Sequence, residues 1–171
     1  LDMRMDNRQT LTAAMIVNDY SETEIAKILR EYGEEPKAKK IAHAIIAARP
    51  LSTTLQLASV VEKIYGRRGK THPATRTFQA LRIAVNEELS QLQTVLPLLP
   101  NLLNIGGRVA VISFHSLEDR LVKHFFASEK QAGYEARLQI LTKKPISGAT
   151  EDVLNRRARS AKLRAAVKIN T

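Results

Sequence analysis

The chain has 171 residues, a mass of 19.1 kDa and a formal net charge of +10, with 44% hydrophobic and 26% charged residues. This composition is that of a globular protein of one domain, or of one domain and part of another, and it excludes disordered and collagen-like chains. The absence of cysteine excludes a disulfide framework, a Cys-ligated zinc and a cysteine nucleophile. Apolar runs fall short of the roughly 18 residues that a membrane helix needs, and the charged first residues are unlike a signal peptide. We therefore expect a soluble, cytoplasmic protein with no membrane partner.

Positive charge is concentrated in the second half of the chain. Residues 1–90 carry 14 basic and 11 acidic side chains, whereas residues 91–171 carry 13 and 6. From residue 153 to the end there are six cations and no carboxylate. A segment whose charged side chains are all positive either binds a polyanion, of which nucleic acid is the first candidate, or remains solvated as a basic tail. Charge alone leaves both interpretations open.

The first part of the chain is expected to form a small helical bundle. Thr10 is the candidate N-cap of its first helix, a capping box at 21–24 precedes the second, and Gly33 is expected to end that second helix. Pro36 and Pro50 bracket the third helix, at positions where proline is tolerated. The expected helices cover residues 10–20, 25–32, 37–49 and 55–65.

A basic loop over residues 67–72 precedes one long helix, expected from Pro73 to about residue 96, with one more turn to Leu103. At helical spacing, residues 78, 81, 85, 89 and 92 share an apolar stripe that would face the core. A polar stripe lies beside it, with Arg76 at its edge. Its members are Gln79, Arg82 and Asn86.

The pattern after residue 104 is strand, helix, strand, loop, strand. Residues 108–114 form a β-branched, nearly continuous apolar run, which is typical of a strand buried on both faces. Ser116 is expected to cap a helix over 117–128, and weaker strands are expected over 137–142 and 162–169. A strand followed by a crossover helix predicts a parallel α/β sheet. Three strands cannot complete such a sheet, and the chain begins inside a loop, so we expect further strands upstream.

Five stretches of the chain are distinctive in order and composition. They are Leu-Asp-Met-Arg-Met-Asp at 1–6, Tyr-Gly-Glu-Glu at 32–35, the run from His72 to Asn86, the run from Gly106 to Arg120, and Arg-Ser-Ala-Lys-Leu-Arg at 159–164. Together they resemble the RsmH (MraW) family of S-adenosylmethionine-dependent small-subunit rRNA methyltransferases. The resemblance covers nearly the whole chain. One local departure is Asn155-Arg156-Arg157, where the family usually has Asn-Pro-Arg.

The resemblance implies the C-terminal part of a class I methyltransferase (Rossmann-like) sheet with an inserted all-helical domain. Residues 1–9 would enter from the absent half of the methyltransferase, residues 10–90 would form the inserted domain, and residues 91–171 would hold the last strands and helices. The implied activity is transfer of a methyl group from S-adenosylmethionine to N4 of a cytidine in bacterial small-subunit rRNA.

The resemblance also implies that the cofactor-binding residues lie upstream, so this chain alone is expected to be inactive. Gly106-Gly107 is not the family's cofactor loop, because it precedes a strand and does not join a strand to a helix. An alternative is a non-catalytic, basic RNA-binding module derived from the same family. A generic basic scaffold for protein partners is a third interpretation, but it does not explain the ordered motifs. The expected partner is small-subunit rRNA or a ribosomal subunit; the oligomeric state stays open, with a dimer possible.

No residue of this chain is expected to be catalytic, and the four histidines do not form a metal-binding pair. His115 follows a strand and could contact RNA, or it could be a satisfied loop histidine. The polar stripe could contact RNA or form a hydrogen-bonded seam, and Asp2, Arg4 and Asp6 are expected to order their loop. The candidate RNA-binding residues are Arg67, Arg68, Lys70, Arg76, Arg82, Asn86, His115, Arg157, Arg159, Lys162 and Arg164.

Overall fold

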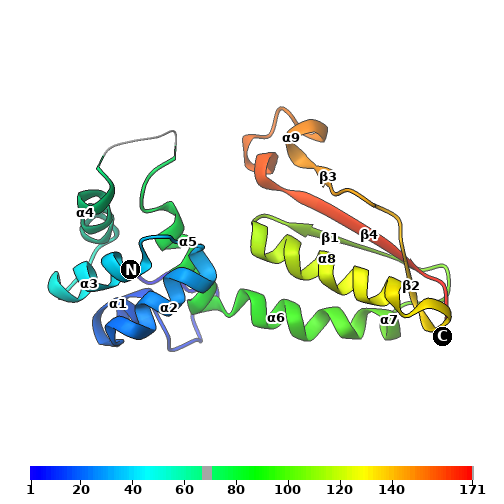
Figure 1. Ribbon diagram of the computed structural model, residues 1–171, viewed down its shortest axis with the longest axis horizontal. Helices are drawn as coiled ribbons and strands as arrows, with labels where there is room; N and C mark the ends of the chain where they lie inside the picture. Colours follow the sequence, from blue (N-terminus) through cyan, green and yellow to red (C-terminus); the bar gives the residue numbers. More distant parts are fainter. Residues whose placement is uncertain (67–70, 171) are drawn as a thin grey trace. The chain divides into compact units, whose positions relative to one another are not determined.

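The computed structural model describes residues 1–66 and 71–170. They form two compact units, Leu1–Glu88 and Leu89–Thr171, which are described separately below. Figure 1 shows helices alone in the first unit and helices with a small sheet in the second.

The described residues of the first unit form a bundle of five helices around an apolar core. Its centre is fully buried and consists of aliphatic side chains, among them Ile16, Leu29, Ile41, Leu57 and Leu81. This confirms the helical bundle expected from the spacing of apolar residues. The helices are α1 (Ala13–Asp19), α2 (Glu22–Gly33), α3 (Ala38–Ala47), α4 (Thr54–Tyr65) and α5 (Thr75–Asn86).

Three helices of this bundle, α1, α2 and α4, begin at side-chain caps. Ser21 and Glu24 form the predicted capping box of α2, and Thr53 forms an equivalent box with Gln56 at α4. The expected cap at Thr10 is wrong, because Thr12 caps α1. The carbonyls of residues 1 and 2 accept the N–H groups of Ala14 and Ala13, at 2.7 and 2.9 Å, so the N-terminal segment also satisfies the first turn of this helix.

Gly33 serves a different purpose from the expected helix stop. It is the last residue of α2, and the left-handed residue that follows is Glu34, at φ 47°. A Cβ atom on residue 33 would lie 2.7 Å from the carbonyl oxygen of Arg76. Glycine is therefore required here because α2 and α5 approach each other closely, and not because the chain needs a positive φ.

The single helix expected over residues 73–96 is wrong, because the chain bends at Glu87. This residue has φ 50°, which ends α5 at Asn86, and α6 (Glu88–Val95) follows. Glutamate gives no sequence signal for a left-handed position, which usually requires glycine or asparagine.

The second unit places helices against a small sheet. After α6 the chain forms the expected extra turn as η1 (Leu96–Leu98) and α7 (Leu99–Leu102). Its buried core includes Leu96, Val122, Phe126, Leu138 and Ala166. The remaining elements are β1 (Arg108–Ser113), α8 (Ser116–Gln131), η2 (Gly133–Glu135), β2 (Leu138–Ile140), β3 (Ile146–Ser147), α9 (Gly148–Glu151), η3 (Arg156–Ser160) and β4 (Lys162–Lys168).

The sheet has the order β1-β4-β2, and β3 also pairs with β4. Each pair is antiparallel, with Ser113 opposite Lys162 and Leu138 opposite Lys168. Since β1 and β2 are both antiparallel to β4, they run parallel to each other, as the crossover through α8 predicts. The expectation of a purely parallel sheet needs correction, because β4 separates the two parallel strands. The α/β class itself is confirmed.

Only one face of β1 is covered. Val109 and Val111 are half-buried, whereas Ala110 and Ile112 are exposed, the latter to 57%. The prediction that residues 108–114 are buried on both faces is therefore wrong within this chain. Figure 1 shows α8 lying along the sheet, and α8 accounts for the covered face. In the described part of the chain, no helix combines the length and apolarity needed to cross a membrane.

Candidate nucleic-acid interface

The polar stripe of α5 holds the N-terminal segment. Asn86 is 4% exposed; its side-chain oxygen accepts the N–H of Met5 at 2.7 Å, and its amide nitrogen donates to the carbonyls of Met3 and Arg82 at 2.9 Å. Met3 has φ 65°, a conformation that this pairing helps to hold. These bonds support the seam interpretation for Asn86, with residues 1–8 as its partner, and RNA contact by this side chain stays a prediction.

Ion pairs order the N-terminal segment further. Arg4 Nε lies 2.6 Å from an oxygen of Asp2, and Arg8 Nη2 lies 2.8 Å from Asp6. Hydrogen bonds from the Arg4 side chain and backbone lower the pKa of the Asp2 carboxyl to about 2, and Arg8 lowers the pKa of Asp6 in the same way. The expectation that these residues order their own loop matches this geometry.

Two arginines of α5 differ in their hydrogen-bond partners. Both Arg82 Nε and Nη2 donate to Glu88, at 2.8 and 2.9 Å, in a bidentate pair. Arg76 is exposed and donates through Nη1 to the carbonyl of Glu34 at 3.2 Å. Of the two, Arg76 is therefore better placed to meet a phosphate group.

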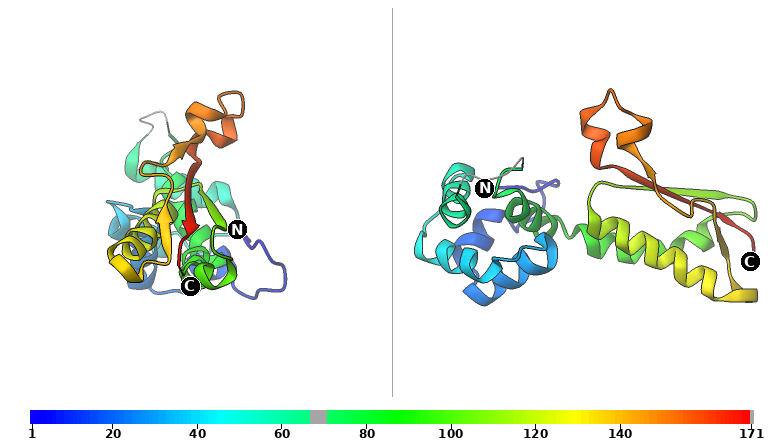
Figure 2. Two further views of the ribbon diagram at one scale, coloured as in Figure 1. Left: turned by 90° about the vertical axis from the view of Figure 1, so that its right-hand side faces the viewer. Right: turned by 45° about the horizontal axis from the view of Figure 1, so that its top comes forward.

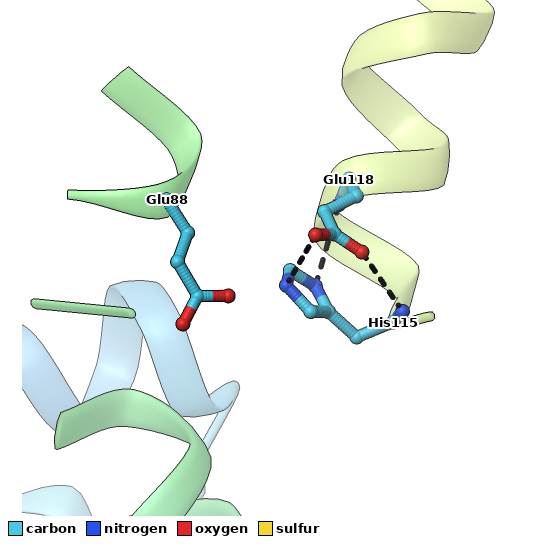
Figure 3. Close-up of side chains that lie close together, drawn as sticks. All are labelled: Glu88, His115 and Glu118. Carbon is cyan, nitrogen blue, oxygen red and sulfur yellow. Dashed lines mark hydrogen bonds and ion pairs between the residues drawn. The ribbon is translucent and has the colours of Figure 1, made fainter. Parts of the chain in front are cut away.

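The end of β1 leads directly into the cap of α8. His115 Nδ1 accepts the N–H of Glu118, and the Glu118 carboxylate accepts the N–H groups of Phe114 and His115 at 2.8 and 3.2 Å. Figure 3 shows the histidine ring and this carboxylate facing each other at the start of α8. The expected cap at Ser116 is wrong, because this capping box begins one residue earlier.

His115 is thus a structural residue whose side chain is only 7% exposed, while Phe114 beside it is 54% exposed. The satisfied-histidine interpretation fits this geometry, and contact between His115 and RNA stays a prediction. At the edge of the sheet where β1 ends, the exposed aromatic group is Phe114.

A buried ion pair joins α8 to β4. Arg164 donates through Nε and Nη2 to Asp119 at 2.7 and 3.2 Å, and each residue is 8% exposed. Lys162 Nζ lies 3.4 Å from the same carboxylate. The hydrogen bond from Arg164 and the positive charge of both cations lower the pKa of Asp119 below its ordinary value, although burial opposes this shift. Asp119 therefore occupies Lys162 Nζ and the Nε and Nη2 atoms of Arg164, whereas Nη1 of Arg164 has no acceptor among the described residues.

Arg157 and Arg159 lie on η3, and both are exposed. Within the part of the chain that the structure describes, neither guanidinium has a carboxylate within 4 Å. Figure 2 shows the segment that carries β3, α9 and η3 extending beyond the rest of its unit. Gly148 permits the tight fold of this segment, because a Cβ atom there would meet the Ala158 carbonyl.

The second unit thus brings five predicted residues to one edge of its sheet. Lys162 is opposite Ser113, His115 follows β1 by two residues, and η3 leads into β4. This edge, where β1 ends, is called the basic edge below. It carries His115, Arg157, Arg159, Lys162 and Arg164. Three further candidates, Arg67, Arg68 and Lys70, lie outside the described residues.

The glycine turns of the described residues do not form a binding loop for S-adenosylmethionine. Gly106 and Gly107 form a turn before β1, where Gly106 donates its N–H to the Lys168 carbonyl and Gly107 accepts the Lys168 N–H, both at 2.8 Å. Their backbone groups are therefore used in pairing β1 with β4. The turn from β1 into α8 consists of Phe114 and His115, so it has no glycine that would let a cofactor approach the backbone.

Sequence reasoning missed two features of this unit. The sequence indicates no role for Asp119, although position 119 lies one turn into a helix that packs on a strand rich in cations. Sequence reasoning also passed over Lys123 and Lys130, whose spacing of seven residues predicts a common face of α8. This seven-residue spacing is the sequence signal from which the shared face of the two lysines could have been predicted.

The second unit is thus an α/β fold with a mixed sheet and exposed cations near the end of β1. The sequence model of the MraW methylase family matches residues 1–169, and the chain belongs to that family. The resemblance drawn from the sequence is confirmed.

Curated relatives support the same family. The chain is 53% identical to "Ribosomal RNA small subunit methyltransferase H" of Trichodesmium erythraeum and 51% identical to the protein of the same name from Acidobacterium capsulatum. These alignments cover 99% and 98% of this chain, but 59% and 57% of the relatives. The chain therefore spans somewhat more than half the length of the relatives that it matches.

Proposed function

We propose that residues 1–171 form the C-terminal portion of an S-adenosylmethionine-dependent methyltransferase. Its reaction is methylation of N4 of a cytidine in bacterial small-subunit rRNA, and its partner is that rRNA or the ribosomal subunit that contains it. The observation that carries this proposal is the match to the MraW methylase family over residues 1–169. The names of the curated relatives support small-subunit rRNA as the substrate.

In this reaction the residues of this chain would bind and orient RNA. Methylating an exocyclic amine requires little covalent participation by the protein, since correct positioning of the reacting groups supplies much of the rate. Arg157 and Arg159 are exposed cations suited to phosphate groups, and Phe114 offers an aromatic face at the end of β1. S-adenosylmethionine would supply the methyl group, and no residue described here is assigned to its binding.

A chimera tests this proposal. The matching part of the Trichodesmium erythraeum relative is replaced by residues 1–171, and incorporation of labelled methyl groups into small ribosomal subunits is measured. We expect methylation by the chimera, because the two sequences are 53% identical over the exchanged part. We expect none from the 171-residue chain alone. A folded chimera that leaves the rRNA unmethylated would contradict the proposal.

A non-catalytic RNA-binding module is the second candidate. The observation in its favour is the combination of exposed arginines on η3 with a glycine turn that is used in sheet pairing. This candidate predicts RNA binding by the 171-residue chain and no methylation by the chimera. The proposed methyltransferase predicts methylation by the chimera, so the same pair of assays separates the two functions.

A further inference from the structure

The second unit contains a cavity whose lining includes one residue of the basic edge, Arg164. Its volume is about 890 Å³, and α8, β2, the residues after β2 and part of β4 line it. Cavities that bind small organic molecules have volumes of roughly 300 to 1,000 Å³, so this cavity has the size of a site for such a molecule.

Cations surround this cavity. Lys123 and Lys130 reach it from one face of α8, and Lys143 reaches it from the segment after β2. All three are exposed, and none has an ion pair or a hydrogen bond within the described part of the chain. None of the twelve described lining residues is an aspartate or a glutamate. The lining is therefore suited to an anion, since three of its cations have no carboxylate partner among the described residues.

A fourth cation is fixed in the wall. Arg164 lines the cavity, and only 8% of it is exposed. Its Nε and Nη2 atoms donate hydrogen bonds to the Asp119 carboxylate, which fixes the plane of the guanidinium. Arginine has five N–H donors, and the described residues supply no acceptor for those on Nη1. A buried, oriented donor of this kind loses little entropy when it binds a phosphate oxygen.

The floor of the cavity is apolar. Phe126 and Leu138 are almost fully buried and line it, and Ile140 lies beside them in β2. An inorganic anion alone would leave this surface uncovered. A ligand with both a phosphate group and a flat, less polar body uses the cations and the floor together.

We propose that this cavity binds one nucleotide of an RNA strand. The phosphate lies among Lys123, Lys130, Lys143 and Arg164, and the ribose or base covers the floor at Phe126. The choice of RNA as the polymer rests on the proposed function, since the chain belongs to a family whose curated relatives are named for ribosomal RNA. A free nucleotide offers the same chemistry, and the experiment separates the two sources.

The first test removes two of the four charges. The full chain carrying Lys123→Gln and Lys130→Gln is titrated with a fluorescent single-stranded RNA, and Lys39→Gln with Lys40→Gln is the charge-matched control on the exposed face of α3. Glutamine is as good a helix former as lysine, so both variants should fold. We expect roughly tenfold weaker binding for the α8 pair and little change for the control. Equal affinities for the two variants would overturn the proposal.

A second variant keeps every charge and fills the cavity. Ala127→Leu places a larger side chain in the lining, and Ser128→Leu makes a similar change at an exposed neighbouring position of α8. We expect Ala127→Leu to weaken RNA binding several-fold and Ser128→Leu to leave it unchanged. Unchanged binding by Ala127→Leu would show that the lysines act only as a diffuse field, which overturns the site.

Three further outcomes show which part of the proposal is wrong. If cytidine monophosphate displaces the RNA at concentrations equal to the RNA's own, the cavity serves a free nucleotide, and the assignment to an RNA strand is wrong. If the unaltered chain binds no RNA, the cavity inference is wrong. The proposed function is then still tested separately by the methylation assay of the chimera. If the chain binds RNA and no cavity variant matters, only the cavity assignment fails.

Discussion

Asn86 shows how one side chain can fix a segment that has no regular structure. The buried side-chain amide of Asn86 donates to the carbonyls of Met3 and Arg82 and accepts the N–H of Met5, so the N-terminal segment is bound to the end of α5. The sequence predicts that Asn86 belongs to a polar stripe beside the apolar stripe of its helix. It does not predict the partner, because Met3 and Met5 are more than 80 positions away and carry apolar side chains.

Substitution Asn86→Ala should lower the free energy of unfolding by about 1 to 3 kcal/mol, because it removes the hydrogen bonds of this side chain to partly buried backbone groups, each of which contributes about 1 kcal/mol. Hydrogen exchange at the Met5 amide should accelerate as well. The matched control is Asn7→Ala, the same chemical change at an exposed position of the same segment. Slow exchange at Met5 in the Asn86 variant would contradict the assigned role.

Asp119 is a second residue whose role depends on burial. Its pKa is lowered in the folded chain, mainly by the hydrogen bond from Arg164, so the folded state favours the carboxylate more than the unfolded chain does. The resulting stabilisation is present above the ordinary pKa of 3.8 and is lost as the pH falls through the folded-state pKa. Asp119→Ala should lower the free energy of unfolding by about 3 kcal/mol at pH 7, because Arg164 remains buried without its partner.

Chemical denaturation of the Asp119→Ala and unaltered chains at pH 7 and at pH 3 measures this difference, which should shrink at the lower pH. The control is the double variant Asp119→Ala with Arg164→Leu, which removes both charges and should recover most of the loss. An equal loss in the single and double variants would show that the ion pair does not carry the stability.

The helices of the bundle and the capping box of α2 were predictable because their signals are local. The capping box at Ser21 and the helix over residues 54–65 depend on neighbours within four positions. The bend at Glu87 was not predictable, because a left-handed glutamate is held by contacts such as the Arg82–Glu88 pair and by no local preference. The exposed face of β1 was also missed, because an apolar run does not reveal whether this chain supplies the elements that cover it.

The start of α8 allows a prediction at the scale of an element. His115→Ala removes an N-cap acceptor and should lower the free energy of unfolding by about 1 kcal/mol, whereas His115→Asn should restore it, since asparagine is a good N-cap residue. Thermal unfolding followed by circular dichroism measures both variants. Parallel RNA titrations then decide the open role of the side chain: a pure cap predicts unchanged RNA affinity in His115→Asn, and a lost affinity in that stable variant would assign His115 to RNA.

For the molecule as a whole, the net charge of +10 left open whether the cations bind a polyanion or stay solvated, and it did not show which cations would meet such a partner. The structure divides these cations by their partners. Arg164 and Lys162 are paired with Asp119, whereas Arg157 and Arg159 are exposed on η3 without a carboxylate among the described residues. Sequence proximity placed all four in one basic segment, and only the packing of β4 on α8 distinguishes them.

Salt dependence tests this division. The logarithm of the affinity for single-stranded RNA should fall linearly with the logarithm of the salt concentration, with a slope that grows by about 0.7 for each phosphate contact. Replacing Arg157 and Arg159 by glutamine should therefore reduce the steepness of this slope by about 1.4 and weaken binding for all RNA sequences alike. Lys27→Gln with Arg30→Gln removes the same charge from the exposed face of α2 and should leave the slope nearly unchanged. Equal slopes for the two pairs would mean that RNA responds to total charge alone, and η3 would lose its assignment as a contact.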